Sequence, residues 1–362
     1  MKECGLLSFL ENFNYKEKYY SLVSIQLTLA FCFLLRIQSI EKISRQSPGE
    51  LGKSIGLDRI PVVETIRKII GDVSVDGQST LWLGNLSKFW MASFPELAGV
   101  LYIDGHENPY FGKNNKLPRK YLTRLRLAMR ATTDYWVNDK IGQPFFSISK
   151  SINPGMIKVI KEEIAPRLEK DIPNQANQEQ LSKDKQLHKF MLVFDREGYS
   201  NDFTIDMWEK RIAICTYKKY VKDKWDESEF REYKIEDENG KTEKIKLAER
   251  SILIEGKESE KLPRALQQIR FIETDEEIEV KIGYKHSKKK RQQWIREIRK
   301  LTEKEHQISI ISSNYKLSIV NIGQYMFARW RQENFFKYMM SNFGIDFIIS
   351  YLKNDIDEVV IL

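Results

Sequence analysis

The chain has 362 residues, and its 59 Lys and Arg against 51 Asp and Glu give a formal net charge of +8. Hydrophobic residues make up 41% and aromatic residues 12%, which excludes intrinsic disorder. The 18 glycines and 10 prolines are too few for a fibrous chain. The three cysteines, Cys4, Cys32 and Cys215, are far apart, which excludes a disulfide framework and predicts a reducing compartment.

The longest apolar run covers residues 19–37 and is the one candidate for a membrane span. Ser21, Ser24, Gln26 and Thr28 interrupt it. We therefore expect a buried helix here instead of a membrane span. This predicts a cytoplasmic protein with no membrane partner.

Residues 1–92 are predicted to form a helical domain. Ser47 and Pro48 are typical of a helix start, and Gly56 can end that helix. Pro61 can open a second helix through residue 70, with Val62, Ile66 and Ile69 on its buried face. Helix, glycine-containing turn and helix is the outline of a helix-turn-helix, and a plain helical hairpin fits equally well. The basic residues that such a motif would expose to DNA are Arg59, Arg67 and Lys68.

Residues 93–217 are predicted to be α/β. Apolar runs and helical spacing indicate a strand, a hairpin, a helix, a strand, a helix and a strand, which is the order of an RNase H-like sheet. The predicted elements cover residues 97–103, 125–137, 144–152, 156–168, 189–194, 201–209 and 211–217.

Two acidic residues follow apolar strands of this predicted sheet. Asp104 comes after the first strand, and Asp195 comes after the strand that ends at Phe194. In open α/β sheets, ligands bind at the carboxyl edge of the strands. The spacing therefore predicts that both carboxylates lie at the edge where ligands bind.

Residues 218–304 are predicted to form a mostly β insertion subdomain, in which Asn239 and Gly240 are a typical hairpin turn. Its end is basic, because residues 281–304 hold ten Lys and Arg against two Glu. Such a stretch indicates a polyanion partner, and a solvated helix face is the alternative. Residues 305–362 then return to the core, with a strand at 306–312 and one long helix over 317–342.

The predicted late helix carries Arg329 and Glu333, which are four residues apart and therefore share one helix face. A surface ion pair is the simplest interpretation of the two. Together, however, Asp104, Asp195 and Glu333 match the need of two-metal phosphodiester chemistry for hard oxygen ligands.

Four segments resemble the insertion-sequence DDE transposases, in the IS4-like branch whose RNase H-like core is interrupted by a β-rich insertion. They are VLYIDGHENPYFGK, TTDYWVNDKIGQPFF, FDREGYS and MFARWRQENFFKYM. By this resemblance Asp104, Asp195 and Glu333 are the catalytic, metal-binding acids. The late helix of the family reads Tyr-x2-Arg-x3-Glu-x6-Lys, and here Met326 and Met340 replace its Tyr and Lys.

The resemblance implies a mechanism. The three acids would hold two Mg²⁺ ions, or Mn²⁺, and a metal-activated water would hydrolyse DNA at the transposon end. The freed 3′-OH would then attack target DNA. Arg329 would contact a phosphate or orient Glu333, Lys337 would supply a charge one turn later, and His106 would support Asp104 or contact DNA.

The resemblance also implies DNA partners, namely the terminal inverted repeats and the target, and a homodimer on paired ends. The helical domain would recognise the repeats. Four basic residues of the insertion would grip phosphates: Lys288, Lys289, Lys290 and Arg291. Two alternatives stay open, a decayed copy that binds DNA without catalysis and an RNase H-like nuclease that cuts without joining. For three aromatic residues of the late helix we expect core positions: Trp330, Phe335 and Phe336.

Overall fold

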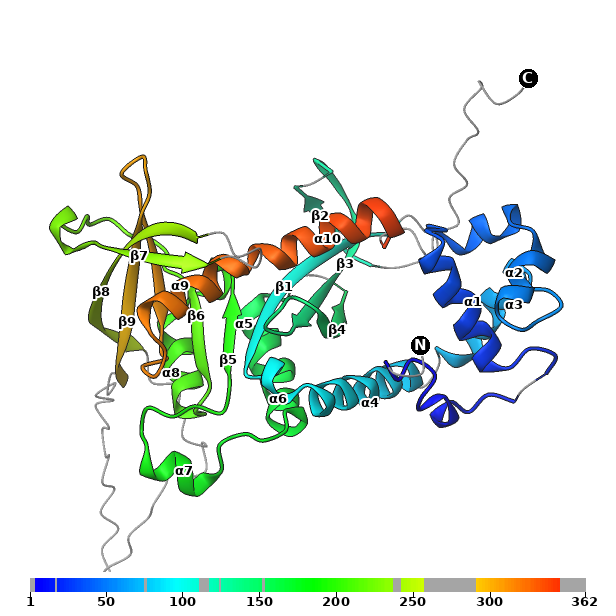
Figure 1. Ribbon diagram of the computed structural model, residues 1–362, viewed down its shortest axis with the longest axis horizontal. Coiled ribbons are helices and arrows are strands. Elements are labelled where there is room, and N and C mark those ends of the chain that lie inside the picture. Colours follow the sequence, from blue (N-terminus) through cyan, green and yellow to red (C-terminus); the bar gives the residue numbers. More distant parts are fainter. Residues whose placement is uncertain are drawn as a thin grey trace, which may run out of the picture.

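The protein is described by a computed structural model that covers residues 4–16, 18–74, 77–110, 117–123, 125–151, 154–236, 242–256 and 291–345. It is a mixed α/β structure with helices on both sides of a large sheet and a group of N-terminal helices beside it (Figure 1). The sheet has ten strands in the order β2-β3-β1-β5-β6-β10-β9-β8-β7, with β4 paired to β3.

The N-terminal helices are α1 (Leu22–Leu34), α2 (Pro48–Ser54), α3 (Val63–Val73) and α4 (Gln78–Ser93). The strands are β1 (Val100–Pro109), β2 (Arg119–Leu122), β3 (Leu127–Asn138), β4 (Pro144–Lys150), β5 (Met191–Phe194), β6 (Ala213–Tyr217), β7 (Arg231–Glu236), β8 (Thr242–Gly256), β9 (Arg291–Leu301) and β10 (Gln307–Ser312). The remaining helices are α5 (Met156–Val159), α6 (Ala165–Asp171), α7 (Gln178–Lys183), α8 (Asn201–Glu209), α9 (Ile319–Ala328) and α10 (Trp330–Phe343).

The centre of the sheet confirms the predicted order of elements along the chain. β1 pairs antiparallel with β3, and β3 pairs antiparallel with β4. β5 lies between β1 and β6 and is parallel to both. All four residues of β5 are buried because both faces are covered. Leu192 and Phe194 pack with residues of α5, α6 and α8, whereas Met191 and Val193 face residues of α9.

Strands β7 to β10 continue the same sheet beyond β6. β10 pairs antiparallel with β6 and β9, and β8 pairs antiparallel with β9 and β7. Strand β8 is long, with 15 residues of the predicted insertion. The predicted turn at Asn239 and Gly240 lies outside the described residues.

The basic stretch is described only from residue 291, and there it forms strand β9, so the interpretation as a solvated helix face is wrong for this part. Among its charged residues lie Ile295 and Ile298, whose side chains are fully buried. Arg299 is also buried, and its guanidinium donates to the buried carboxylate of Glu297 over 2.8 Å. Arg296 pairs with Glu249 across the strands. These arginines are therefore neutralised inside the fold.

The late helix is broken, and the prediction of one continuous helix is wrong. α9 ends at Ala328 and α10 begins at Trp330, so Arg329 alone stands between them. The amide of Gln332 donates to the Arg329 carbonyl over 3.0 Å, a tight turn that replaces the regular α-helical bond at this point. The break lets α9 cover the sheet while α10 runs on towards the N-terminal helices (Figure 1).

Helices α2 and α3 form the predicted helix–turn–helix outline. Pro48 is the first residue of α2, and Gly56 in the turn has a φ of 78°. α3 begins at Val63 and not at Pro61, so Val62 is 61% exposed and Val63 takes the predicted buried position. Among the described residues, no helix is both long and apolar enough to cross a membrane, and α1 has 13 residues.

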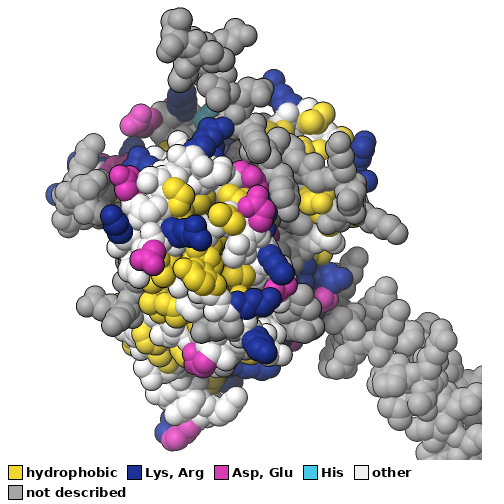
Figure 2. Space-filling model, turned by 90° about the vertical axis from the view of Figure 1, so that its right-hand side faces the viewer, with side chains coloured by type: hydrophobic (Ala, Val, Ile, Leu, Met, Phe, Trp, Pro, Cys, Tyr) yellow, Lys and Arg dark blue, Asp and Glu magenta, His cyan; other side chains and the backbone are white. Residues whose placement is uncertain are grey.

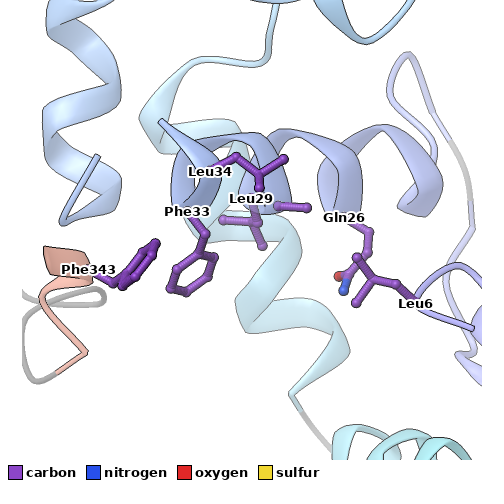
Figure 3. Close-up of a pocket in the computed structure, with 7 residues that line it drawn as sticks. Leu6, Gln26, Leu29, Phe33, Leu34 and Phe343 are labelled. Carbon is purple, nitrogen blue, oxygen red and sulfur yellow. The ribbon is translucent and has the colours of Figure 1, made fainter. Parts of the chain in front are cut away.

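The end of α10 touches α1. The rings of Phe33 and Phe343 lie 6.5 Å apart, and the amide of Gln38 donates to the Ser341 carbonyl over 3.3 Å. A mostly apolar pocket opens beside this contact, as Figure 3 shows, and Figure 2 shows hydrophobic side chains gathered on this side of the molecule. The pocket is lined by Leu6, Gln26, Leu29, Ala30, Phe33, Leu34 and Phe343. With Gln26 as its one polar side chain, it offers no set of groups for catalysis.

We expect Gly52→Ala to destabilise the N-terminal helices. A Cβ at Gly52 would lie 2.6 Å from the Cα of Arg59, so the turn after α2 would have to move. Overpacking of this kind costs roughly 1–3 kcal/mol. Denaturant unfolding measures the change. Gly49→Ala in the same helix is the matched control, because its Cβ would meet nothing closer than the Asp58 carbonyl at 3.7 Å. Equal stability of the two variants would contradict the close approach.

We also expect acid to destabilise the fold through His188. Burial, and then the charge of Arg211, lower the pKa of His188 to about 4 from 6.5, against a weaker opposing effect of Asp184. Below pH 6.5 the unfolded chain binds a proton that the folded chain refuses until about pH 4, so stability falls across this window. The loss is roughly 1 kcal/mol per pH unit.

His188→Phe keeps a ring against Trp208, whose centroid lies 5.0 Å away, and should flatten this pH dependence. The measurement is the free energy of unfolding against pH for the variant and the wild type. His306→Phe at an exposed position is the control. Parallel curves for His188→Phe and the wild type would contradict the assignment.

Candidate functional site

The register of the parallel strands brings Asp104 beside Asp195. The last pair between β1 and β5 is Ile103 with Phe194, and each acid is the next residue of its strand. Since neighbouring strands lie about 4.8 Å apart, the two backbones are adjacent here. The expectation that Asp104 ends its strand is wrong, because β1 continues to Pro109 in its pairing with β3. It is the parallel pairing with β5 that ends at this point.

Backbone amides hold both carboxylates at this edge. Oδ1 of Asp104 accepts from the amide of Gly105 over 2.9 Å, and Oδ1 of Asp195 accepts from the amide of Arg196 over 2.7 Å. The hydroxyl of Thr216 on β6 donates to the carbonyl of Asp195 over 3.0 Å. These hydrogen bonds fix the backbone and the carboxylate at both Asp104 and Asp195.

Glu333 comes to the same place from α10 through Arg329. One guanidinium nitrogen of Arg329 lies 2.7 Å from Oε1 of Glu333, and another lies 3.9 Å from Oδ2 of Asp104. The Arg329 side chain is only 12% exposed. The interpretation of Arg329 and Glu333 as a surface ion pair is therefore wrong, because the guanidinium is largely buried and also faces Asp104.

The four groups act as one electrostatic unit. Burial raises the pKa of Asp104 to about 6; Arg329 opposes this shift, and the negative charges of Asp195 and Glu333 add to it. Burial lowers the pKa of Arg329, but the three carboxylates outweigh this effect and raise it. Three negative groups thus act on one positive partner, Arg329.

Carboxylate oxygens are ligands that Mg²⁺ and Mn²⁺ prefer, so the donor set fits such an ion. The spacing of the carboxylates in this structure does not fit a metal site. Within the part of the chain that the structure describes, no three His, Cys, Asp or Glu side chains are close enough together to hold a metal ion. The guanidinium of Arg329 contacts Asp104 and Glu333 at the same time.

A buried amide fixes α10 to the sheet next to Glu333. Gln332 is 1% exposed, and its Nε2 donates to Oδ1 of Asn138 over 2.7 Å and to the carbonyl of Trp136 over 3.3 Å. Trp136 lies directly opposite Asp104 in the pairing of β3 with β1. Gln332 therefore ties the helix of Glu333 to the strand that neighbours Asp104.

Aromatic contacts complete the attachment of α10. His106 is buried, and its ring stacks on Phe336 with centroids 5.0 Å apart. Phe336 is in the core as predicted, whereas Trp330 is 59% exposed, contrary to prediction. Lys337 is exposed, and its Nζ lies 5.6 Å from the centre of the Trp330 ring.

Met326 does not face the carboxylates. It is 1% exposed in the core between α9 and the sheet, and its sulfur lies 3.9 Å from Sγ of Cys215. The Met326 side chain therefore packs between α9 and the sheet.

The basic residues expected to bind DNA differ in their surroundings. Arg59 and Lys68 are exposed, whereas Arg67 pairs with Glu41 over 2.8 Å. Arg291 pairs with Asp206 over 2.8 Å on α8. The other three candidates lie outside the described residues: Lys288, Lys289 and Lys290.

The sequence interpretation missed Gln332 and Asn138. The sequence does contain a signal for a buried polar residue. Gln332 is the polar member of a row at four-residue spacing that also contains Ala328, Phe336 and Met340. Asn138 comes directly after the predicted strand over residues 125–137. Its side chain in fact donates to the Gly142 carbonyl over 2.8 Å while it accepts from Gln332.

We expect Gln332→Leu to lower the free energy of unfolding by about 1–3 kcal/mol, because Oδ1 of Asn138 would stay buried without its donor. Denaturant unfolding measures the loss. Asn334→Leu on the exposed side of α10 is the control and should cost much less. If the two variants unfolded alike, the buried amide would not anchor the helix.

Comparison with known proteins identifies the family. The sequence matches the family described as "Transposase protein" over residues 2–270 and 267–362. No curated protein matches it. Among solved structures, a Mos1 transposase paired-end complex with the left transposon end has a TM-score of 0.20 and 9% identity, over 56% of this chain and 60% of that chain. A pre-cleavage Mos1 transpososome has a TM-score of 0.21, 9% identity and the same coverage. The matched region thus spans about 60% of the Mos1 chain. On the family match, which covers nearly the whole length, the chain belongs to a transposase family.

Proposed function

We propose that the protein is a DDE transposase of the IS4-like branch that cuts DNA at transposon ends and joins it to target DNA. The observation that supports this proposal is that Asp104, Asp195 and Glu333 all act on the charge of Arg329 beside the carboxyl end of β5. Three carboxylates with a single positive partner are costly to bury, and a structural role would be served better by apolar residues.

In this proposal Asp104, Asp195 and Glu333 would hold two Mg²⁺ or Mn²⁺ ions, which would supply charge neutralisation and an activated water. The chain's own part is to fix the carboxylates on ordered backbone and to exclude bulk water with α10. Arg329 turns from Glu333 and Asp104 to a DNA phosphate, for which its planar guanidinium is well suited. Gln332, His106 and Phe336 keep α10 in place.

The chemistry is a pair of phosphoryl transfers in sequence. Hydrolysis at the transposon end breaks a P–O bond and leaves a 3′-OH, and this hydroxyl then attacks a phosphodiester of target DNA. In the second step the attacking oxygen forms the new P–O bond as the target's own 3′ oxygen leaves, so no covalent enzyme intermediate is needed. Positioning and charge neutralisation provide most of the rate.

The proposal also assigns the remaining parts. Residues 1–92 form a helical domain that binds the terminal inverted repeats, residues 93–217 and 305–362 form the catalytic core, and residues 218–304 are an insertion. Arg59 and Lys68 are the exposed basic residues near the turn between α2 and α3. Two copies of the chain act on paired ends.

We expect Asp195→Asn to abolish metal-dependent nicking of DNA that carries the ends of the element. Loss of one preorganised electrostatic group costs on the order of 10²–10³-fold in rate. The assay measures nicked and joined products with Mg²⁺ or Mn²⁺. Asp134→Asn is the matched control. Asp134 is two residues along β3 from Trp136, the residue opposite Asp104, but its carboxylate is hydrogen-bonded to the side-chain amide of Asn108.

Each outcome separates the candidates. Nicking and joining by the wild type and the control, lost in Asp195→Asn, supports the proposal. Nicking that never leads to joined products would replace it with an RNase H-like nuclease. Binding of the ends without any cutting would make the chain a DNA-binding copy that has lost catalysis.

A further inference from the structure

The hairpin of β2 and β3 carries a concentration of positive charge that the proposed chemistry does not use. In the sequence, residues 108–133 contain seven Lys and Arg and no Asp or Glu. In the described residues, β2 pairs with the first part of β3 from Arg119 opposite Arg130 to Leu122 opposite Leu127. The hairpin stands beyond α10 at the upper edge of the sheet (Figure 1).

The strand register puts part of this charge on the face that carries the acids. Side chains alternate along a strand, and directly opposed residues share a face. Asp104 is opposite Trp136, and Trp136, Asp134, Thr132 and Arg130 alternate along β3. Arg130 therefore lies on the face of Asp104. Arg119, its partner across the hairpin, and Tyr121, two residues further, lie there too.

This charge is not neutralised within the described structure. Directly opposed like charges such as Arg119 and Arg130 destabilise a hairpin. No carboxylate of a described residue pairs with Arg119, Arg126 or Arg130, whereas Lys120 pairs with Glu107. The arginines of β9 differ in this respect, because each of them has a carboxylate partner.

Exposed side chains of other kinds lie between the arginines. Tyr121 is 58% exposed, and Leu127 is 57% exposed. Basic residues interleaved with exposed aromatic and apolar ones are typical of surfaces that follow a nucleic-acid backbone. An acidic protein partner would need carboxylates in fixed positions, whereas a phosphate backbone offers regularly spaced charge along the whole hairpin.

We propose that the β2–β3 hairpin is a DNA-binding arm in which Arg119, Arg126 and Arg130 contact phosphates and Tyr121 packs against the backbone. This inference rests on the proposed function, because it takes DNA as the substrate of the acids on the same face. The amide of Tyr110 donates to the Arg130 carbonyl, six residues along β1 from Asp104. At about 3.3 Å per residue this is roughly 20 Å. The arm therefore contacts the duplex at a distance from the acids, so its phosphates differ from the one that the acids attack.

The test compares salt dependence of DNA binding between two double variants. Arg119→Gln with Arg130→Gln removes two positive charges from the arm. Arg231→Gln with Lys234→Gln removes two exposed charges from β7, at the far edge of the sheet. The probe is a fluorescein-labelled DNA duplex of mixed sequence, and its anisotropy gives the affinity at a series of KCl concentrations. We expect the slope of log K against log salt to shrink by about 2 for the arm variant, at 0.9 per lost phosphate contact, and to stay unchanged for the control.

Other results overturn the inference. If the wild type does not bind the duplex, the proposed function and the arm both fail. If the wild type binds and the arm variant keeps its slope, or if the control loses as much, the arm fails and the proposed function stands. A changed oligomeric state of the arm variant without DNA, with an unchanged slope, assigns the hairpin to protein contact.

Thermal unfolding shows whether the variants fold. We expect no loss of stability in Arg119→Gln with Arg130→Gln, because the change removes a repulsive pair. Arg126→Gln is a second variant in the turn, outside the paired strands, and its slope should shrink by about 1.

Discussion

The arrangement of the site depends on one guanidinium. Asp104, Asp195 and Glu333 would repel one another at the buried edge of a sheet, and Arg329 is the cation that all three face. Its place in the chain matters as much as its charge. Arg329 is the single residue between α9 and α10, so its side chain can reach Asp104 on the sheet while it also bonds to Glu333, one turn later. The same guanidinium therefore contacts carboxylates from two separate elements, β1 and α10.

Backbone pairing sets the rest of the geometry. The parallel register of β1 and β5 puts the first two acids side by side, and Gln332 fixes α10 to the residue opposite Asp104. No long loop has to be ordered to bring these groups together. The positions of the acids are thus a property of the sheet and one docked helix, which is the kind of support that precise positioning of reacting groups requires.

Local pattern was enough to predict the central elements. The buried run of β5 and the helical spacing of α8 follow from periodicity alone, and the acids follow from their places after such runs. The sequence places Asp104 at a strand end because the apolar run stops before it. In the structure, antiparallel pairing with β3 extends β1 past Asp104 to Pro109. The break at Arg329 has no proline or glycine to mark it. Gln332 and Asn138 form a hydrogen bond although they are 194 residues apart in the sequence, and no local sequence pattern indicates such a contact.

The same limit applies to charge. By composition, the basic stretch that leads into β9 has the greatest excess of Lys and Arg, yet Arg291, Arg296 and Arg299 each have a carboxylate partner in the fold. The hairpin of β2 and β3 has fewer charges, but no carboxylate of the described residues faces its arginines. A cluster of positive charge is available to a polyanion only where cross-strand and helical neighbours leave it unpaired. The unpaired charges of Arg119 and Arg130 therefore lie on the face of the sheet that carries the acids, where the proposed function requires a bound duplex to pass.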